Sequence, residues 1–558
     1  MQTIDLIIQN GQILDVINKK ILKTNVYIDK GKVIALGNQL PYSAKQIIDA
    51  HQQYLAPGFI DAHVHIESSM VTPSELGKVI IPMGVTTIVV DPHEIANVCG
   101  VAGIKYMMND AKQSPLEVLV KLPSSVPATD FEHNGATLTA QDLHPLYDEP
   151  TTVGLAEVMD YPAVHNHNAD MMDKINDAIA HHGIVDGHGA GLNASQLKEY
   201  LYNGITTDHE STSLAQMQDR LAVGMNVFLR EGTVERDLQN TIAAVNDSNS
   251  SRFSFCTDDK LISTIVKEGS INFNIQLAIQ NGIDALTAYQ MASYNAAQAH
   301  HLNQLGAIKE GYQADIVFIR DLDKVNVTQV IKHGKVIDDI DFATKPLPFA
   351  AGGVHQNIHP QDLRLPLEHD FCHVMGVIPN HIETIHLKKH VPVKDGYFVT
   401  DLKQDILLMV DVERHHNLGT YGLSLVHGFK IKHGAVATTI AHDSHNIVAV
   451  GTSADAIYRA IDEVTKSHGG IAVVDEEKTL ATMPLPIAGL MSNQPWSIAS
   501  HQLEAISEAY QQISEPIDFD PFITLSFLTL PVIPTLKLTD QGLYDFDQQK
   551  FIKVNIDK

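Results

Sequence analysis

Two histidines and two acids stand together in GFIDAHVHIESS, residues 58–69, a stretch that otherwise has the apolar character of a buried strand. Residues i and i+2 of a strand point to the same side, so His63 and His65 are expected to project together. Paired imidazoles bind borderline metals such as Zn, Mn and Fe well. Taken alone, the pair leaves a second interpretation open, in which both histidines are structural. Asp61 and Glu67 add two carboxylates beside it.

Acids and histidines also follow other strand-like runs between residues 57 and 305. Eight apolar runs alternate there with helix-like segments such as ADMMDKINDAIAHH, which predicts an α/β fold with a (β/α)8 TIM-like barrel. Their nearly continuous apolar character is typical of parallel strands buried on both faces. The runs are APGFIDAHVHI, VTTIVVDPHE, EVLVKLPSS, TVGLAEVMD, GIVDGHG, GITTDHE, MNVFLREG and FSFCTDD.

Polar residues collect at the carboxyl ends of these runs, where active-site residues of TIM barrels lie. Beside further imidazoles and carboxylates, the first histidine pair is better explained as part of a metal site than as two structural residues. The residues at these ends are His63, His65, His93, Glu94, Glu157, His188, His209, Glu210, Asp258 and Asp259.

The flanks of the barrel, residues 1–56 and 306–345, are predicted to build one small β domain. LIIQNGQILD has an Asn-Gly pair between apolar runs, which predicts a hairpin turn, and VYIDKGKVIALG predicts another turn at Lys30-Gly31. VIKHGKVID at 330–338 repeats the first pattern, so we expect both flanks to contribute strands to the same domain.

Residues 346–558 are expected to form an additional C-terminal α+β domain. Pro-rich joints such as KPLPFAAGG precede strand-like segments such as GGIAVVD. The stretch AHDSHNI brings His442, Asp443 and His445 together. Three interpretations of this group stay open: a second metal site, a loop closing over the barrel mouth, and a polar turn before a strand.

The composition excludes some classes of partner. The chain has 39 Lys and Arg against 66 Asp and Glu, a net charge of -27, whereas nucleic acids and anionic membranes favour Lys/Arg clusters. Three widely separated cysteines indicate no disulfide framework. No run reaches the roughly 18 apolar residues of a membrane span, and the chain begins without a signal-peptide pattern. We therefore expect a cytoplasmic protein that acts on a small molecule.

In these motifs the chain resembles the amidohydrolase superfamily and, within it, the adenine deaminase family. The His-x-His pair is typical of the whole superfamily, whereas PHEIANV, AEVMD and AHDSHNI are much more specific. The resemblance spans nearly the whole chain and implies a TIM-like barrel followed by the family's C-terminal domain. It is carried by PGFIDAHVHIESS, TTIVVDPHEIANVCG, LPSSVPAT, GLAEVMD, DGHGAGL, GITTDHES, FCTDD, HGAVATTIAHDSHNIVAVG, GGIAVVD and LPLPIAGLMS.

The resemblance also implies a site for two divalent metal ions, Mn(II) or Fe(II), with Zn as an alternative. Glu157 matches a carboxylate that bridges the two ions, where many superfamily members carry a carboxylated lysine; Lys121 is its nearby rival. Asp258 matches an aspartate that binds metal and handles the proton of the attacking water. The implied metal ligands are His63, His65, Glu157, His188, His209 and Asp258.

Other residues at the strand ends have two interpretations each. The candidate catalytic residues are Asp258, Glu210 and Glu67, of which the last two either shuttle protons or orient a neighbouring imidazole. Asp259 either hydrogen-bonds the purine or caps a turn. Ser68 either contacts substrate or caps a helix, and the cap is the favoured interpretation. The candidate substrate-binding residues are Asp259, His93, Glu94 and Ser68.

The reaction implied by the resemblance is hydrolytic deamination of adenine, in which a metal-bound hydroxide attacks C6 and hypoxanthine and ammonia are released. One alternative is an amidohydrolase that cuts a cyclic amide, although Glu157 in place of lysine argues against it. A metal-free interaction scaffold is the other. A cytidine-deaminase-type zinc site is excluded because its H-x-E…P-C-x-x-C signature is absent. A homo-oligomer, by default a dimer, is expected.

Overall fold

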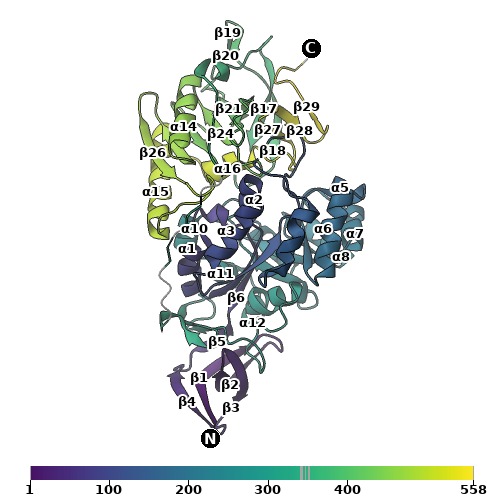
Figure 1. Cartoon of the computed structure of the whole chain (residues 1–558), viewed down its shortest axis with the longest axis vertical. Helices are drawn as coiled ribbons and strands as arrows, with labels where there is room; N and C mark the ends of the chain where they lie inside the picture. The colour runs from purple at the N-terminus through teal and green to yellow at the C-terminus, as the bar shows by residue number, and fades with distance from the viewer. Residues whose placement is uncertain (1, 340–343, 346, 350–351, 557–558) are drawn as a thin grey trace.

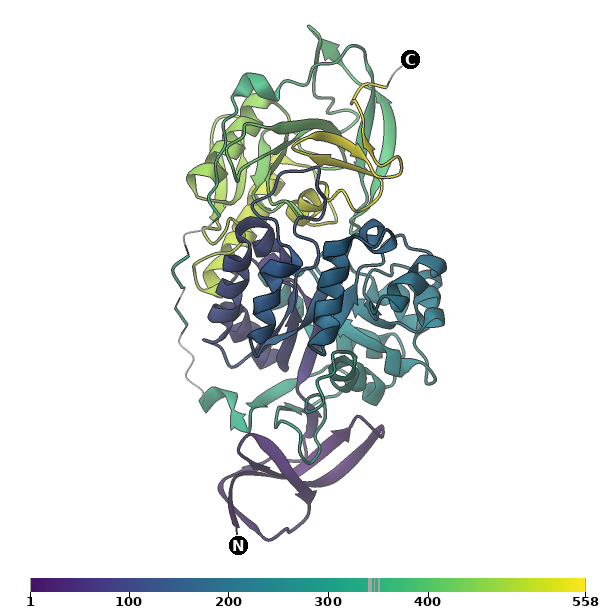
Figure 2. The same ribbon diagram turned by 45° about the vertical axis from the view of Figure 1, so that its right-hand side comes forward.

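The computed structural model describes residues 2–339, 344–345, 347–349 and 352–556. The chain forms three parts along one long axis: the N-terminal strands at one end, a barrel in the middle, and the C-terminal segments at the other end (Figures 1 and 2). We retain as a proposal the domain boundaries 1–56 with 306–345, 57–305 and 346–558. Residues 340–343 and 346, beside the last boundary, lie outside the described residues.

Both flanks of the barrel contribute to one eight-stranded sheet at the N-terminal end. β5 pairs antiparallel with β14, with Leu55 opposite Phe318, and this pairing joins the two flanks. The order is β16-β15-β14-β5-β1-β2-β3, with β4 beside β1. The strands are β1 (Gln2–Asp15), β2 (Lys20–Asp29), β3 (Lys32–Gly37), β4 (Tyr42–Asp49), β5 (Tyr54–Pro57), β14 (Ile316–Ile319), β15 (Val327–Lys332) and β16 (Lys335–Val336).

The hairpin turn predicted at the Asn-Gly pair of LIIQNGQILD is wrong. β1 continues through this pair, and Asn10, at φ 58°, lies at a register shift between Ile8 and Gly11. Such a shift is a β-bulge, which bends a strand without reversing it. The turn predicted at Lys30-Gly31 is confirmed, with φ values of 51° and 76° between β2 and β3.

The predicted eight-stranded parallel barrel is confirmed. Five strands, β6 to β10, and three strands, β11 to β13, form two parallel sheets, and isolated parallel bridges Val64–Asp258 and Val185–Ile205 close the ring. Every residue of β6 and β7 is buried, as expected of strands covered on both faces. The strands are β6 (Phe59–Val64), β7 (Val85–Val90), β8 (Glu117–Leu122), β9 (Thr152–Val158), β10 (Ile184–Gly187), β11 (Thr207–Asp208), β12 (Asn226–Arg230) and β13 (Phe253–Cys256).

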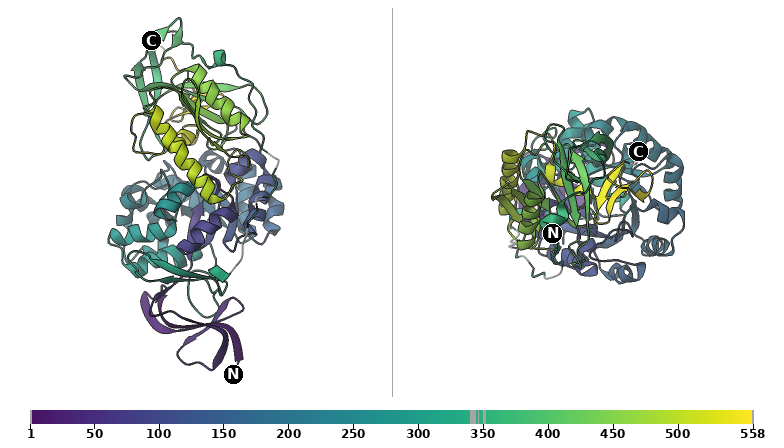
Figure 3. Two further views of the ribbon diagram at one scale, coloured as in Figure 1. Left: turned by 90° about the vertical axis from the view of Figure 1, so that its left-hand side faces the viewer. Right: turned by 90° about the horizontal axis from the view of Figure 1, so that it is seen from above.

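Helices surround the barrel strands as a ring that is visible from above (Figure 3). The segment ADMMDKINDAIAHH forms α6, as predicted. The helices are α1 (Pro73–Ile80), α2 (His93–Cys99), α3 (Val101–Ala111), α4 (Ala140–Leu143), α5 (Tyr161–His165), α6 (Ala169–Ala180), α7 (Ala194–Tyr202), α8 (Leu214–Val223), α9 (Leu238–Thr241), α10 (Ile262–Glu268), α11 (Ile271–Gln280), α12 (Ala285–Gln290) and α13 (Ala296–Ala299).

The C-terminal part is the expected α+β domain, built on a second eight-stranded sheet of order β18-β17-β22-β21-β24-β23-β25-β26. The strands are β17 (Phe371–Val377), β18 (Thr384–His390), β19 (Val393–Lys394), β20 (Tyr397–Phe398), β21 (Ile406–Val412), β22 (Tyr421–His427), β23 (Ala435–Thr438), β24 (Ile447–Gly451), β25 (Gly470–Val474), β26 (Thr479–Pro484), β27 (Leu536–Thr539), β28 (Gly542–Asp545) and β29 (Lys550–Phe551). The helices are α14 (Ala454–Lys466), α15 (Trp496–Ile513) and α16 (Pro521–Phe527).

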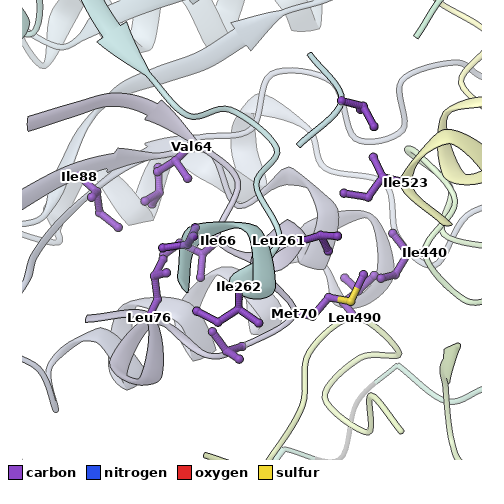
Figure 4. Packing of buried hydrophobic residues seen from close by; sticks show 14 of the residues in the cluster. Val64, Ile66, Met70, Leu76, Ile88, Leu261, Ile262, Ile440, Leu490 and Ile523 are labelled. Carbon is purple, nitrogen blue, oxygen red and sulfur yellow. The ribbon is translucent and has the colours of Figure 1, made fainter. Parts of the chain in front are cut away.

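One hydrophobic cluster extends from the barrel into the C-terminal domain. Met70 and Leu261, on the barrel side, share this cluster with Ile440, Leu490 and Ile523 of the C-terminal domain (Figure 4). Removing this apolar surface from water holds the domain against the carboxyl end of the barrel strands. Within the described ranges, no helix is long and apolar enough to cross a membrane.

A buried ion pair ties two neighbouring strand ends of the barrel. Arg220, on α8, donates from Nε to Asp208 Oδ2 at 2.8 Å and from Nη2 to Gly189 O at 2.5 Å. Asp208 Oδ1 accepts the Gly189 amide at 2.6 Å. Gly189 directly follows His188 and Asp208 directly precedes His209, so this network fixes the backbone on which both histidines stand.

We predict that Arg220→Ala lowers the free energy of unfolding by about 3–5 kcal/mol, because it leaves the Asp208 carboxylate buried without its charged partner. Thermal and urea unfolding of the variant would measure the loss. Arg252→Ala is the control, since Arg252 is exposed and its side chain donates only to Gly224 O among the described residues. Equal stability of the two variants would contradict a structural role for the buried pair.

Candidate active site

Asp61 ties the first barrel strand to the last and thereby positions the residues around it. Its carboxylate accepts hydrogen bonds from Thr257 N at 3.0 Å and Thr257 Oγ1 at 2.5 Å. Burial raises the pKa of Asp61 to about 7, although these hydrogen bonds partly offset the effect. Backbone bonds continue the tie, from Asp258 N to His63 O at 3.1 Å and from His65 N to Asp258 O at 3.2 Å. Asp61, the acid that precedes the histidine pair, therefore links the first strand of the barrel to the last.

His63 and His65 face one point inside the barrel mouth, as expected from their i and i+2 spacing. Their Nε2 atoms are 3.1 Å apart, and Asp258 Oδ1 lies 3.5 Å from His63 Nε2 and 3.2 Å from His65 Nε2. His65 Nδ1 lies 3.1 Å from Asp91 O. Because a carbonyl oxygen only accepts, Nδ1 carries the proton, and a neutral His65 has its Nε2 lone pair free to bind a cation.

Glu157 lies between this group and the histidines of the following strands. Its Oε1 is 3.5 Å from His65 Nε2, and its Oε2 is 3.1 Å from His209 Nε2. The rings of His209 and His63 stack with centroids 4.1 Å apart, and His188 packs edge-on against His209 at 5.9 Å. The structure therefore brings all six sequence-predicted ligands into one buried cluster.

Lys121, the rival of Glu157, is held by a different partner. Its Nζ lies 2.5 Å from Asp186 Oδ1, and both side chains are buried. Burial lowers the pKa of Lys121, and the attraction of Asp186 only partly offsets this effect. The ion pair accounts for the buried lysine without a carbamate.

The carboxylates of the cluster stay ionised although they are buried. Burial alone raises the pKa of Glu157 and Asp258, but the surrounding imidazoles, His209 foremost, bring both values well below their usual range. In turn, Asp258, Glu157 and Glu210 raise the pKa of His209 to about 10 against the effect of burial. The cluster therefore attracts positive charge, whether as protons or as cations.

Arg230, at the end of β12, is a residue of the site that the sequence analysis missed. Its Nη1 donates to Glu210 Oε1 and, at 3.1 Å, to Asp258 Oδ2, while its Nε donates to Asp237 Oδ2 at 2.7 Å. Glu210 Oε1 also lies 3.5 Å from His188 Nε2. Arg230 thus orients Asp258, whose φ of 56° is uncommon for a residue other than glycine. The sequence feature that could have identified Arg230 is its position at the end of the strand-like run MNVFLREG.

Ser68 connects two of the other candidate residues. Its single hydroxyl proton is donated to Asp259 Oδ1, and its Oγ lies 2.8 Å from Glu94 Oε1. Ser68 lies within a short 3-10 turn, Glu67–Ser69, and Thr72 is the N-cap of α1, so the helix-cap interpretation of Ser68 is wrong. Glu67 Oε1 accepts from Ile95 N at 3.1 Å, and burial raises the pKa of Glu67 to about 7.

The C-terminal domain reaches the barrel cluster through its AHDSHNI stretch. Asp443 Oδ1 lies 3.4 Å from His93 Nε2, and His93 Nδ1 lies 3.1 Å from Asp91 Oδ2. His445 Nε2 lies 3.8 Å from Glu94 Oε2. The structure places this stretch over the barrel mouth. His442 also belongs to two groups that could hold a metal ion, one with His93 and Asp443 and one with Glu94 and His445, so the metal-site interpretation stays open beside the closing segment.

A small cavity of about 20 Å³ lies between the cluster and the C-terminal domain. Asp259 and His93 line it, whereas Glu94, Ser68 and Glu67 are not among the described residues that do. Sequence reasoning missed three apolar side chains that line it from the C-terminal domain, because nothing distinguishes them from core residues. We call these three the roof: Ile382, Phe527 and Leu530.

Known proteins match the chain over its whole length. Residues 54–337 match the amidohydrolase family, and residues 381–550 match the adenine deaminase C-terminal domain. An adenine deaminase of Listeria welshimeri is 52% identical over 550 residues, 97% of this chain and 95% of the relative. This chain belongs to the adenine deaminase family. The family member from Lactiplantibacillus plantarum is 52% identical over 556 residues, 100% of this chain and 98% of the relative.

Solved structures match the adenine deaminase-family chain less closely. A crystal structure described as that of an adenine deaminase covers 60% of this chain and 99% of its own, at 17% identity and a TM-score of 0.45. An adenosine deaminase of Xanthomonas campestris, solved with bound zinc, covers 60% of this chain and 93% of its own, at 16% identity and a TM-score of 0.45.

Amidohydrolases are metal-dependent, and the residues of this cluster fit a metal. His63, His65 and Asp258 form one buried group with potential ligand atoms within 4.8 Å of one another, and His63, Glu157 and His209 form a second. Glu157 Oε2 is buried, and although His209 Nε2 lies 3.1 Å away, the two atoms do not meet in hydrogen-bond geometry. Imidazole nitrogens with carboxylate oxygens are the donor set that Zn, Mn and Fe prefer.

We predict that Glu157→Gln loses at least one metal equivalent per chain, because a neutral amide bridges two cations poorly. Metal analysis of both proteins, purified with the same supplement, would measure the loss. Glu132→Gln is the matched control, since Glu132 is equally buried but bonds to Thr129. Unchanged metal content in Glu157→Gln would contradict the bridging assignment.

Proposed function

We propose that this protein catalyses the hydrolytic deamination of adenine to hypoxanthine and ammonia. The observation that carries the proposal is the barrel cluster of imidazoles and carboxylates enclosed by an adenine deaminase C-terminal domain. The cavity between them is lined by residues of the cluster and by side chains of the C-terminal domain. Identity of 52% to adenine deaminases along the whole chain supports the same reaction.

We further propose that the cluster holds two divalent cations, Mn(II) or Fe(II), with Zn(II) as the alternative. His63, His65 and Asp258 would hold one ion, and His188 and His209 the other, with Glu157 between them. When bound, such ions lower the pKa of water towards about 7 and so supply a nucleophile at neutral pH.

Asp258 is proposed to move the proton of the attacking water. Its carboxylate faces the cluster through Oδ1, while Oδ2 is held by Arg230 at 3.1 Å. The carboxylate is ionised, so it has a lone pair that can accept a proton and pass it to a ring nitrogen of adenine. A C6–O bond forms as the first water proton goes to the ring nitrogen. The second water proton, on the new C6 hydroxyl, then passes to the amine, the C6–N6 bond breaks, and ammonia leaves. Glu210 and Glu67 keep their proposed roles as proton shuttles or orienting groups.

The net charge of -27 supports a small-molecule substrate rather than a nucleic acid. We propose that the protein works in the cytoplasm as a homo-oligomer, with a dimer as the simplest arrangement. Size-exclusion chromatography with light scattering measures the subunit number directly.

The proposed function predicts ammonia release from adenine by protein loaded anaerobically with Mn(II) or Fe(II). Chromatography should detect one hypoxanthine for each ammonia released, because one C–N bond is hydrolysed per turnover. Adenosine and a cyclic amide such as dihydroorotate are assayed alongside. Hydrolysis of the cyclic amide without turnover of adenine would reassign the substrate, and no turnover together with no bound metal after supplementation would favour the metal-free scaffold.

Asp258→Asn is expected to lower kcat for adenine by at least about 10²-fold, because an amide cannot accept the proton of water. The assay uses saturating Mn(II), so that weaker metal binding does not limit the rate. The melting temperature should stay close to that of the wild type. Near-normal turnover would mean that another group handles the proton.

A further inference from the structure

Glu235 is a buried acid on the cavity wall that the proposed mechanism does not use. Its side chain lines the cavity and the residue is 2% exposed, yet neither carboxyl oxygen has a hydrogen-bond partner among the described residues. Burying a carboxyl group without such partners is costly. A ligand that donates hydrogen bonds to this group would remove that cost.

The backbone around Glu235 is built to hold this group at the cavity. Thr233 N donates to Asp259 O at 2.8 Å, and Gly232 N donates to Glu235 O at 3.1 Å. A Cβ at Gly232 would lie 2.6 Å from Asp259 O and 3.2 Å from Glu235 Oε2, so only glycine permits this close approach. The turn therefore sets the Glu235 carboxyl beside Asp259 on one wall.

Arg230 and Asp259, the other charged groups on this wall, already have hydrogen-bond partners. The Nε and Nη1 atoms of Arg230 donate to Asp237, Glu210 and Asp258, and no ion pair within 4 Å joins the guanidinium to Glu235 in the described ranges. Asp259 accepts from Ser68 Oγ. Burial, with the nearby Asp259 charge, raises the pKa of Glu235 well above its usual range. A carboxyl group accepts a hydrogen bond in either protonation state, and its neutral form also donates one.

The rest of the cavity indicates what such a ligand looks like. The roof offers apolar side chains that suit the flat face of a heteroaromatic ring. If C6 of adenine lies at the barrel cluster, its exocyclic amine is the leaving group, and the imidazole-ring N–H at N9 remains as a donor. A nucleoside has no such N–H, because N9 carries the sugar.

We propose that Glu235 determines specificity for the free base, by accepting a hydrogen bond from the imidazole-ring N–H of the purine. This role of Glu235 rests on the proposed function, because Glu235 would be the group that selects free adenine as the substrate of that reaction. In the neutral form of Glu235, the carboxyl O–H also donates to N3, which neighbours N9. N9-substituted purines lack the donor and leave the buried carboxyl unpartnered, which is how a polar site rejects an analogue.

The test measures binding to the metal-loaded protein by calorimetry, with hypoxanthine as the N–H donor and 9-methylhypoxanthine as its analogue. Glu235→Met keeps the length of the side chain but removes its oxygens. We expect it to weaken hypoxanthine binding by about 10- to 100-fold, the effect of losing one hydrogen bond to a carboxylate. Binding of the methylated analogue should change less than about threefold. Glu235→Gln, which keeps an acceptor oxygen, should restore most of the preference.

Glu231→Gln is the matched control, because Glu231 is equally buried, lies on the same segment and does not line the cavity. It should leave the ratio of the two affinities unchanged. Equal losses for both ligands in Glu235→Met, or no loss for either, would overturn the inference. If that variant does not fold, Glu235→Asp provides the same comparison, because it withdraws the acceptor by one methylene.

Ammonia release from adenine by the wild-type protein distinguishes failure of the specificity role of Glu235 from failure of the proposed function. An active wild type whose preference survives in Glu235→Met overturns the specificity role alone. An inactive wild type overturns the proposed function itself.

Discussion

The rest of this structure depends on the burial of two carboxylates among four imidazoles at one end of a barrel. Glu157 and Asp258 are both almost fully buried and both remain ionised. Buried charges need partners, and here the partners come from different strands of the ring. The parallel bridge between Val64 and Asp258 brings the last strand beside the first, and without this closure Asp258 would not meet the His63/His65 pair. Closure of the barrel and assembly of the cluster are therefore the same event.

Buried polar ties directly adjoin the residues of the cluster and make its geometry rigid. Asp61 bonds Thr257 one residue before Asp258. Asp208 bonds Gly189 and Arg220 beside His188 and His209. Each tie fixes the backbone on which a proposed ligand stands, so the imidazoles meet at the Nε2 to oxygen distances of 3.1–3.5 Å seen here. Such a supporting layer is what a site with fixed geometry requires.

The sequence predicted the barrel and the cluster because both follow from simple periodic rules. Strand ends in a parallel barrel share one face, so acids and histidines at those ends must converge. The Asn10-Gly11 bulge was missed because the same dipeptide favours a turn and a bulge, and only pairing with β2 decides between them. Arg230 was missed although it stands at the end of a strand-like run, where the same rule applies to a cation. Glu235 was missed because its importance depends on having no hydrogen-bond partner among the described residues, which a sequence does not show.

The roof was equally invisible in the sequence, yet its support shows that it belongs to the site. Lys537 is fully buried, and its Nζ donates to Ile382 O at 2.6 Å and to Phe527 O at 2.8 Å, which joins two separate segments of the roof. Burial lowers the pKa of Lys537 to about 7, so the cross-link is costly to maintain. Phe527 in turn stacks on His442, with ring centroids 4.4 Å apart. A barrel whose mouth lay open would let water compete for every hydrogen bond of the cluster. Fixing an apolar roof over it removes that competition and strengthens each electrostatic contact inside, so the C-terminal domain forms part of the active site.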